Sequence, residues 1–292
     1  MDAPARKPDW FRTSIRRLAV GETASAVLRT VSEQGLHTVC TSASCPNKGA
    51  CFAEGTATFM ILGDVCTRAC RFCNIETGRP GAEDPDEPRR LAEAAAAMGL
   101  RFVVVTSVCR DDLPDEGAGA FARTIRALRE KMPGVRVEVL TPDFSGREEC
   151  LCEVLGASPD VFNHNLETVR RLTSRIRTKA RYERSLALLA RARELSPQTP
   201  TKSGLMVGLG ETRDELREAF ADLAAAGVER LTIGQYLQPS RLHHPVVRFY
   251  EPEEFDAMRG EARAAGIRAV LAGPLVRSSY HAGQFVEEPI PE

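Results

Sequence analysis

From Thr58 onward, short apolar runs alternate with stretches that are rich in alanine and charged residues. Such alternation is typical of buried parallel strands connected by crossover helices. Six units of this kind favour an α/β fold in the form of a partial (β/α)6 TIM-type barrel. The predicted strands span residues 58–62, 102–106, 135–140, 161–163, 204–207 and 231–236.

The intervening stretches have apolar residues at helical spacing, and Gly99 and Gly227 follow two of them as C-terminal stops. The predicted helices span residues 89–98, 120–131, 182–195 and 213–226, and a further helix at 252–265 precedes a strand at 267–271. Residues 1–57 are irregular and polar, apart from a short helix expected around 25–34. We therefore expect an N-terminal extension (1–57), a barrel (58–265) and a C-terminal segment (266–292), with the two extensions covering the barrel mouth.

Ligands of a parallel barrel bind where loops leave the C-terminal ends of the strands. Polar runs lie at these positions and are candidates for a site, although any one of them is also consistent with an ordinary polar connection. They span residues 107–113, 142–146, 164–167, 208–211 and 238–240.

Composition excludes several classes of protein. The 292 residues are 43% hydrophobic and 27% charged, with a net charge of −1, so they indicate one large folded core and no dedicated nucleic-acid binder. The basic N-terminal residues lack an apolar stretch behind them, and no apolar run is long enough to span a bilayer, so we expect a cytoplasmic protein without a membrane partner. Nine cysteines in a reducing compartment favour metal ligation or catalysis over disulfides.

Six of the cysteines form two groups of three: Cys40, Cys45 and Cys51, then Cys66, Cys70 and Cys73. Structural zinc sites use four ligands, commonly in CxxC pairs, so two triplets fit zinc poorly. Disulfides conflict with the expected compartment, and ferredoxin-type carriers use a fourth cysteine and are usually much shorter. Three thiolates leave one iron of a [4Fe–4S] cluster open, which indicates chemistry at the metal.

The second triplet has CxxxCxxC spacing, in GDVCTRACRFCNIETG, directly after a predicted strand. In this motif, including the aromatic Phe72, the chain resembles the radical S-adenosylmethionine (SAM) superfamily. The resemblance implies that Cys66, Cys70 and Cys73 hold a [4Fe–4S] cluster whose free iron binds SAM. It also implies that an electron passed to SAM releases a 5′-deoxyadenosyl radical, which removes hydrogen from an unactivated carbon.

The first triplet, in CTSASCPNKGAC, narrows the resemblance. Together with GLHTVC, TSVCRDDL, NHNLETV, KSGLMVGLGET, GQYLQPS and GPLVRSSYHA, it makes nearly the whole chain resemble the lipoyl synthase family. That family inserts sulfur at C6 and C8 of an octanoyl chain carried on a protein lysine, and each insertion consumes one SAM. The resemblance implies that an auxiliary [4Fe–4S] cluster on the first triplet supplies the sulfur. Its fourth ligand is then a serine of the RSSY block, placed at Ser279 with Ser278 as the alternative; the sequence alone predicts only a turn or cap there.

The resemblance also implies partners. These are octanoylated lipoyl carrier domains (2-oxoacid dehydrogenase E2 subunits and the glycine cleavage H protein), an electron donor such as flavodoxin or ferredoxin, and an iron–sulfur carrier protein. Two other functions remain open from the residues: a biotin synthase-like enzyme that acts on a free small molecule, and a two-cluster electron carrier that performs no catalysis.

Asn163, Asn165 and Glu167 resemble the substrate-side NHNxET block of the family. The resemblance implies that side-chain amides hold the octanoyl-lysine amide, whereas hydrogen bonds within the loop are the alternative.

Gly208, Gly210 and Glu211 follow a predicted strand, where they would let the backbone approach SAM. They do not form a dinucleotide-binding fingerprint, because Arg213 replaces the third glycine.

The chain departs from the family pattern at Glu116, where glycine is usual, and at Thr141, where isoleucine is common. In the TSVCRDDL block, Arg110, Asp111 and Asp112 either bind a cofactor or substrate group or pair with each other as surface charges. The remaining cysteines match no ligand position and are interpreted as ordinary thiols: Cys109, Cys150 and Cys152.

A basic stretch between Arg170 and Arg184 is either a solvated helix face or a docking site. Because lipoyl carrier domains tend to be acidic, we hypothesise that this stretch helps to dock them. Its members are Arg170, Arg171, Arg175, Arg177, Lys179, Arg181 and Arg184.

Overall fold

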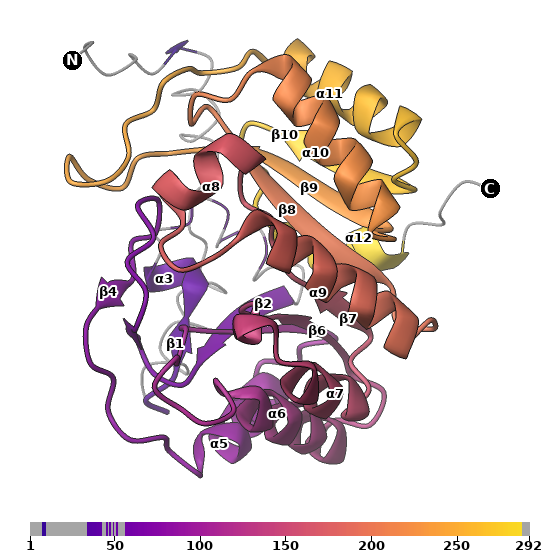
Figure 1. Cartoon of the computed structure of the whole chain (residues 1–292). Coiled ribbons are helices and arrows are strands. Elements are labelled where there is room, and N and C mark those ends of the chain that lie inside the picture. Colours follow the sequence, from indigo (N-terminus) through magenta and orange to yellow (C-terminus); the bar gives the residue numbers. More distant parts are fainter. Residues whose placement is uncertain are drawn as a thin grey trace.

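One eight-stranded sheet organises the part of the chain that the structure describes. The structure is a computed structural model and describes residues 8–9, 34–42, 45, 47, 49, 51 and 56–287 (Figure 1). The strands lie across the sheet in chain order, with β1 antiparallel to β2 and all later neighbours parallel. They are β1 (His37–Thr38), β2 (Thr56–Ile61), β5 (Phe102–Ser107), β6 (Arg136–Leu140), β7 (Val161–Asn163), β8 (Thr201–Val207), β9 (Arg230–Gln235) and β10 (Ala269–Gly273). A separate pair joins β3 (Val65–Cys66) to β4 (Glu76–Thr77).

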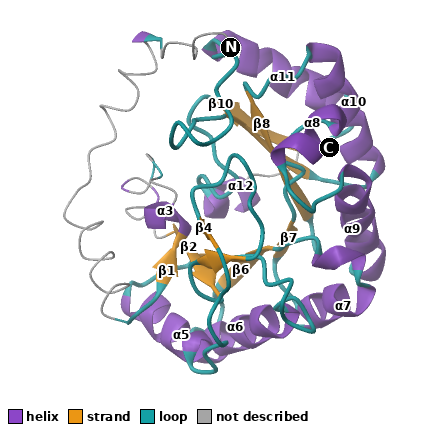
Figure 2. Cartoon of the chain, turned by 60° about the vertical axis from the view of Figure 1, so that its left-hand side comes forward, coloured by secondary structure: helices purple, strands orange, loops and turns teal. Residues whose placement is uncertain are grey.

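Helices connect the parallel strands and form an arc outside them (Figure 2). The longer helices are α5 (Glu87–Ala97), α6 (Ala118–Lys131), α7 (Glu148–Gly156), α9 (Tyr182–Leu195), α10 (Arg213–Ala225) and α11 (Pro252–Ala264). The shorter ones are α3 (Val39–Ser42), the 3-10 turn η1 (Phe144–Gly146), α8 (Arg170–Ile176) and α12 (Ala282–Glu287). Among the described residues, no helix has both the length and the apolar character that crossing a membrane requires.

The core lies between the outer face of the sheet and these helices. One hydrophobic cluster joins β2, β5 and β6 to α5, α6 and α7, and a second joins β8 and β9 to α10 and α11. Removal of this apolar surface from water is the main stabilising term, because each large side chain that is fully buried contributes about 1.5–3 kcal/mol. Buried members include Phe59, Val103, Phe121 and Ile125 in the first cluster and Phe220, Ile233 and Phe255 in the second.

The predicted α/β class and partial barrel are confirmed, although several elements differ from the prediction. Strand β8 begins at Thr201 rather than at residue 204. Its first three residues were missed because Thr201, Lys202 and Ser203 are polar, although all three are fully buried. Strand β10 pairs with β9, so the sheet extends beyond residue 265. Helices α7 and α8 were not predicted, since they are only nine and seven residues long. The helix predicted at 25–34 lies outside the described residues except for Gln34.

Helix α12 lies at the end of the barrel opposite to the one predicted. Ala282 packs against Phe102 and Val161, the first residues of β5 and β7, and the Arg230 guanidinium at the start of β9 donates to the Phe285 carbonyl. Figure 2 shows α12 inside the curve of the sheet. The expectation that the whole C-terminal segment covers the mouth is therefore wrong for α12, which closes the N-terminal ends of the strands because its apolar residues meet an apolar inner face there.

A buried ion pair lies on the inner face above α12. Lys202 Nζ is 2.9 Å from both carboxylate oxygens of Glu138, and Asn163 donates to the same carboxylate. Both charged side chains are fully buried, and Lys202 lies 5.6 Å from the Phe285 ring. The barrel interior is thus polar between its apolar base and its mouth.

Candidate active site

The loop that carries the second cysteine triplet spans the barrel mouth. It leaves the C-terminal end of β2 and is held by three other loops. Thr67 N donates to the Cys109 carbonyl after β5 at 3.1 Å, and Arg71 N donates to the Ile176 carbonyl at the end of α8 at 2.8 Å. A third contact joins the Cys73 carbonyl to His243, after β9. The loop therefore lies where a parallel barrel binds its ligands.

The three thiols of this loop interact electrostatically and suit a cationic cluster. Cys66 Sγ accepts from the backbone N–H groups of Arg68 and Cys109 at 3.4 and 3.3 Å. A hydrogen bond with the Cys109 thiol lowers the pKa of Cys66 to about 6, whereas burial raises the pKa of Cys70 and raises that of Cys73 to about 12. Each thiolate also disfavours charge on its neighbours, so burial and mutual repulsion oppose three anionic thiolates, and the iron of a cluster would offset both effects.

No three His, Cys, Asp or Glu side chains in the described ranges are arranged to hold a single metal ion. A [4Fe–4S] cluster binds its ligands through separate irons, so its fit depends on the donor set described above. Cys109, which the sequence presents as an ordinary thiol, lies directly against Cys66.

The first triplet lies beside the C-terminal segment. Burial and the nearby Cys45 and Cys51 thiols raise the pKa of Cys40 to about 12, which places these sulfurs within electrostatic range of one another. Asn47, between two of them, donates to the Leu275 carbonyl at 2.6 Å, and Arg277 interacts electrostatically with Cys45. The structure thus brings the segment just before Ser278 and Ser279 to the first triplet, although 228 positions separate Asn47 from Leu275.

A buried ionic network fixes the cysteine loop from below. Arg68 is only 4% exposed and contacts Asp111 at 2.6 Å, Asp143 at 2.7 Å and Glu116 at 3.7 Å. Burial acts to raise the pKa of Asp111, but hydrogen bonds from Arg68, Thr67 and a lysine outweigh it and lower this pKa to about 2. Asp111 is therefore an anchor for the loop.

The neighbouring Arg110 is also buried, and it pairs with Asp112 at 2.9 Å. The TSVCRDDL block left two possibilities open, binding of a cofactor or substrate group and pairing of charges within the protein. The geometry favours charge pairing.

The NHNxET residues divide between the barrel interior and the mouth. Asn163 is fully buried and donates to Glu138, while Asn165 donates to Glu167 at 3.1 Å. Glu167 interacts electrostatically with Cys70 and Cys73, which places it beside the cysteine loop. The Oδ1 atoms of both asparagines are buried without a partner among the described residues, so they are positioned to accept hydrogen bonds from a ligand.

Gly204 makes room for one of these side chains. A Cβ at Gly204 would lie 2.7 Å from Asn165 Oδ1, so a larger residue there would force the asparagine side chain to shift.

Gly208, Gly210 and Glu211 form a tightly held turn after β8. Gly208 has a φ of 98°, and a Cβ there would lie 2.4 Å from the Arg248 carbonyl, so glycine is required. The Glu211 carboxylate accepts from the Gly208 and Leu209 N–H groups at 2.6 and 2.9 Å. Glu211 therefore holds the turn, and a contact between this turn and SAM stays a prediction.

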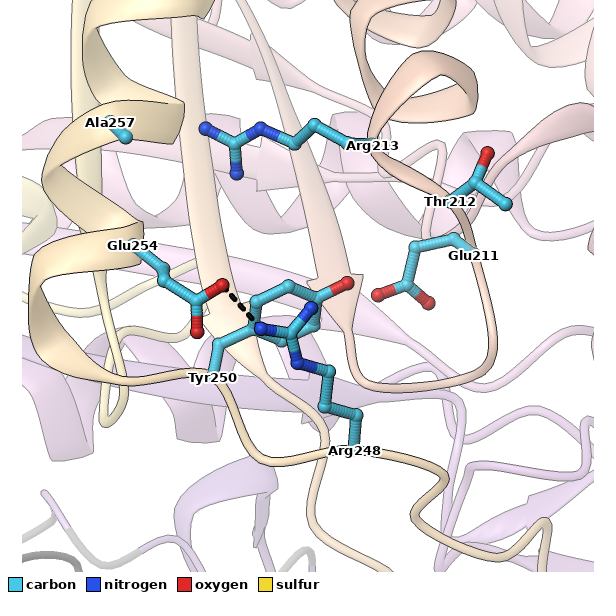
Figure 3. Close-up of a pocket in the computed structure, with 7 residues that line it drawn as sticks. All are labelled: Glu211, Thr212, Arg213, Arg248, Tyr250, Glu254 and Ala257. Carbon is cyan, nitrogen blue, oxygen red and sulfur yellow. Dashed lines mark hydrogen bonds and ion pairs between the residues drawn. The ribbon is translucent and has the colours of Figure 1, made fainter.

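A cavity of about 330 Å³ lies behind this turn, between the N-termini of α10 and α11 (Figure 3). None of the cysteines lines it, so it is separate from the cysteine site. Its two arginines are paired, Arg248 with Glu254 and Arg213 with Glu261. Its lining residues are Glu211, Thr212, Arg213, Arg248, Tyr250, Glu254 and Ala257.

Sequence reasoning missed the histidines that fasten the loop after β9 to the cysteine loop. His243 Nε2 lies 3.0 Å from the Cys73 carbonyl, and His244 N donates to the Arg71 carbonyl at 2.8 Å. The sequence pointed to this loop in part, because the polar run at 238–240 follows the end of a strand. The role of the two histidines could not be predicted, because the sequence does not show which loops meet across the mouth.

Comparison with known sequences gives consistent results. The radical SAM superfamily matches residues 60–223. The lipoyl synthase of Methylococcus capsulatus is 58% identical over 283 residues, covering 97% of this chain and 87% of its own. Lipoyl synthases of Klebsiella pneumoniae and Thermus thermophilus are each 54% identical, covering 96% and 97% of this chain and 87% of their own.

Solved structures agree on the fold. A methylornithine synthase superimposes with a TM-score of 0.51 at 13% identity, covering 89% of this chain and 81% of its own. HydG, a maturase of the [FeFe]-hydrogenase, superimposes with a TM-score of 0.52 at 14% identity, covering 96% and 77%. At these identities the similarity concerns the partial barrel alone.

Proposed function

The chain belongs to the lipoyl synthase family of the radical SAM superfamily, and from that premise we propose how its residues divide the family's reaction. It is a sulfur-inserting enzyme that uses SAM and two [4Fe–4S] clusters. When bound, SAM and one cluster supply the hydrogen-abstracting chemistry, and the auxiliary cluster supplies the sulfur. Its substrate is an octanoylated lipoyl carrier protein.

Cys66, Cys70 and Cys73 are the proposed ligands of the SAM-binding cluster. The supporting observation is the loop itself, whose three interacting thiols are held across the barrel mouth by contacts to the loops after three other strands. Arg68 keeps the loop in place through its buried carboxylate partners. Such anchoring fixes the geometry on which hydrogen abstraction depends.

The first triplet and the RSSY block are the proposed ligands of the auxiliary cluster. The contact between Asn47 and Leu275 supports this assignment, because it brings the segment containing Ser278 and Ser279 towards Cys45. We propose Ser279 as the fourth ligand. In this division, residues 1–57 contribute the three cysteines, 58–265 most of the barrel and 266–292 the serine.

The octanoyl-lysine arm is proposed to enter between the two cysteine groups. Asn163 and Asn165 each offer a buried carbonyl oxygen without a partner among the described residues, suited to an amide N–H of the arm. Glu167, beside Cys70, and the turn at Gly208, Gly210 and Glu211 are proposed to contact SAM. The largely buried barrel interior excludes water from the reacting carbon.

The proposed partners follow the family. They are the E2 subunits of 2-oxoacid dehydrogenases and the glycine cleavage H protein as carriers, flavodoxin or ferredoxin as the electron donor, and an iron–sulfur carrier protein. We propose that the enzyme works in the cytoplasm, because its six ligand thiols require a reducing compartment.

Two variants test the division of labour. After anaerobic reconstitution, we expect Cys70→Ala to lose 5′-deoxyadenosine production, because the SAM-binding cluster lacks a ligand. We expect Cys45→Ala to keep producing 5′-deoxyadenosine but to yield no lipoyl product. Both products are measured by mass spectrometry, with Cys152→Ala as the exposed-cysteine control. Identical behaviour of the first two variants would contradict the proposed roles.

A further inference from the structure

The rim of the barrel mouth presents an exposed leucine. Leu242 is 92% exposed, far more than the other exposed large hydrophobics in the described residues, Val247 at 55% and Leu195 at 37%. Its loop, between β9 and α11, is fastened to the cysteine loop through His243 and His244. A single exposed apolar side chain is common on protein surfaces, so the significance of Leu242 depends on its neighbours.

Three exposed arginines lie on the same rim without a carboxylate partner in the described part of the chain. Arg71 is in the cysteine loop, Arg175 is in the last turn of α8, and Arg241 precedes Leu242. Hydrogen bonds join their segments, because Arg71 N donates to the Ile176 carbonyl and His244 N donates to the Arg71 carbonyl. We call Arg71, Arg175, Arg241 and Leu242 the mouth patch.

The two exposed arginines at the start of α8 contrast with the mouth patch. Arg170 pairs with Glu183, Glu218 and Asp222, and Arg171 pairs with Glu215. The basic stretch suggested by the sequence is thus largely neutralised within the protein. The whole chain has a net charge of −1, so a partner is not attracted by the overall charge of the protein, and what distinguishes the mouth patch is that three unpaired arginines lie together beside an exposed leucine.

We propose that the mouth patch docks the octanoylated carrier domain through an acidic face of that domain. This inference rests on the proposed function, in which a lysine arm must pass the mouth while the carrier body stays outside. The body then meets the rim, where three guanidinium groups complement carboxylates and Leu242 supplies an apolar contact. Arginine is enriched among residues that dominate binding energy, and charge complementarity sets association rate and specificity.

The test compares two substrates of one reconstituted holoenzyme, an intact octanoylated carrier domain and a short octanoyl-lysyl peptide. The patch variant combines Arg175→Glu, Arg241→Glu and Leu242→Ala. The control makes the same changes away from the mouth, with Arg101→Glu before β5, Arg263→Glu on α11 and Leu195→Ala at the end of α9. All six side chains are exposed. Arg71 stays unchanged, since it lies between two proposed cluster ligands.

We expect the patch variant to raise the KM for the carrier domain about tenfold or more, with the KM for the peptide unchanged. The control variant should change neither value. Added salt should raise the carrier KM of the parent enzyme more than that of the patch variant, because screening removes an attraction that the variant already lacks.

A carrier KM in the patch variant that stays close to the parent value would overturn the docking proposal. An equal rise for carrier and peptide would also overturn it, because it would indicate damage to the active site. The single variant Leu242→Ala, at a position that is 92% exposed, repeats the comparison if the triple variant folds poorly. Failure of the proposed function is distinct, since the parent enzyme would then fail to convert even the peptide.

Discussion

At the residue scale, the chain concentrates buried charge beneath one loop. Arg68 faces the carboxylates of Asp111, Asp143 and Glu116, and Arg147 contacts Glu116 from the other side. Glu116 has a φ of 49°, a left-handed conformation that is unfavourable for residues with a side chain and that glycine adopts freely. The chain accepts backbone strain there and gains a buried carboxylate near Arg68.

Two substitutions at Glu116 separate strain from charge. Glu116→Ala and Glu116→Gly both remove the carboxylate. The left-handed backbone at position 116 stays strained with alanine, whereas glycine adopts the same positive φ without strain. We expect the glycine variant to be more stable than the alanine variant by about 1 kcal/mol, measured as the free energy of unfolding in urea. An alanine variant as stable as the glycine variant would show that no strain is present.

At the element scale, β9 and the C-terminal segment approach each other closely. The Val276 carbonyl oxygen fills the space beside Gly234 that a side chain would need. A Cβ added at Gly234 would lie 2.1 Å from this oxygen. The segment then continues to α12 at the far end of the barrel, and Ser278 and Ser279 lie between these two contacts. Their position therefore depends on how β9 and α12 hold this segment.

Substitution of Gly234 tests that dependence. Gly234→Ala must displace the segment that carries the proposed serine ligand, so we expect the reconstituted protein to lose about half of its iron, the auxiliary share. Production of 5′-deoxyadenosine should persist. The control is Gly260→Ala in α11, where a Cβ meets open space; it should keep all iron and gain about 0.5–1 kcal/mol of stability. Full iron content in Gly234→Ala would argue against an auxiliary cluster that depends on this segment.

At the scale of the whole molecule, the sequence predicted the features that local patterns encode. The continuous apolar run of β5 and the CxxxCxxC loop after β2 were both readable, because each depends on a few consecutive residues. Ser279 came from family resemblance alone. Contacts such as Asn47 with Leu275, or Cys73 with His243, join residues more than 150 positions apart and leave no local pattern. The place of α12 was mispredicted for the same reason, since six residues do not reveal which end of a barrel they fill.

The central claim is that this chain converts a carrier-bound octanoyl-lysine into a lipoyl-lysine. The most direct test is the intact mass of an octanoylated carrier domain after anaerobic incubation with reconstituted enzyme, SAM and a reductant. The account predicts a mass change equal to two hydrogens replaced by two sulfurs, with about two molecules of 5′-deoxyadenosine formed per lipoyl group. An unchanged carrier mass despite 5′-deoxyadenosine formation would contradict it.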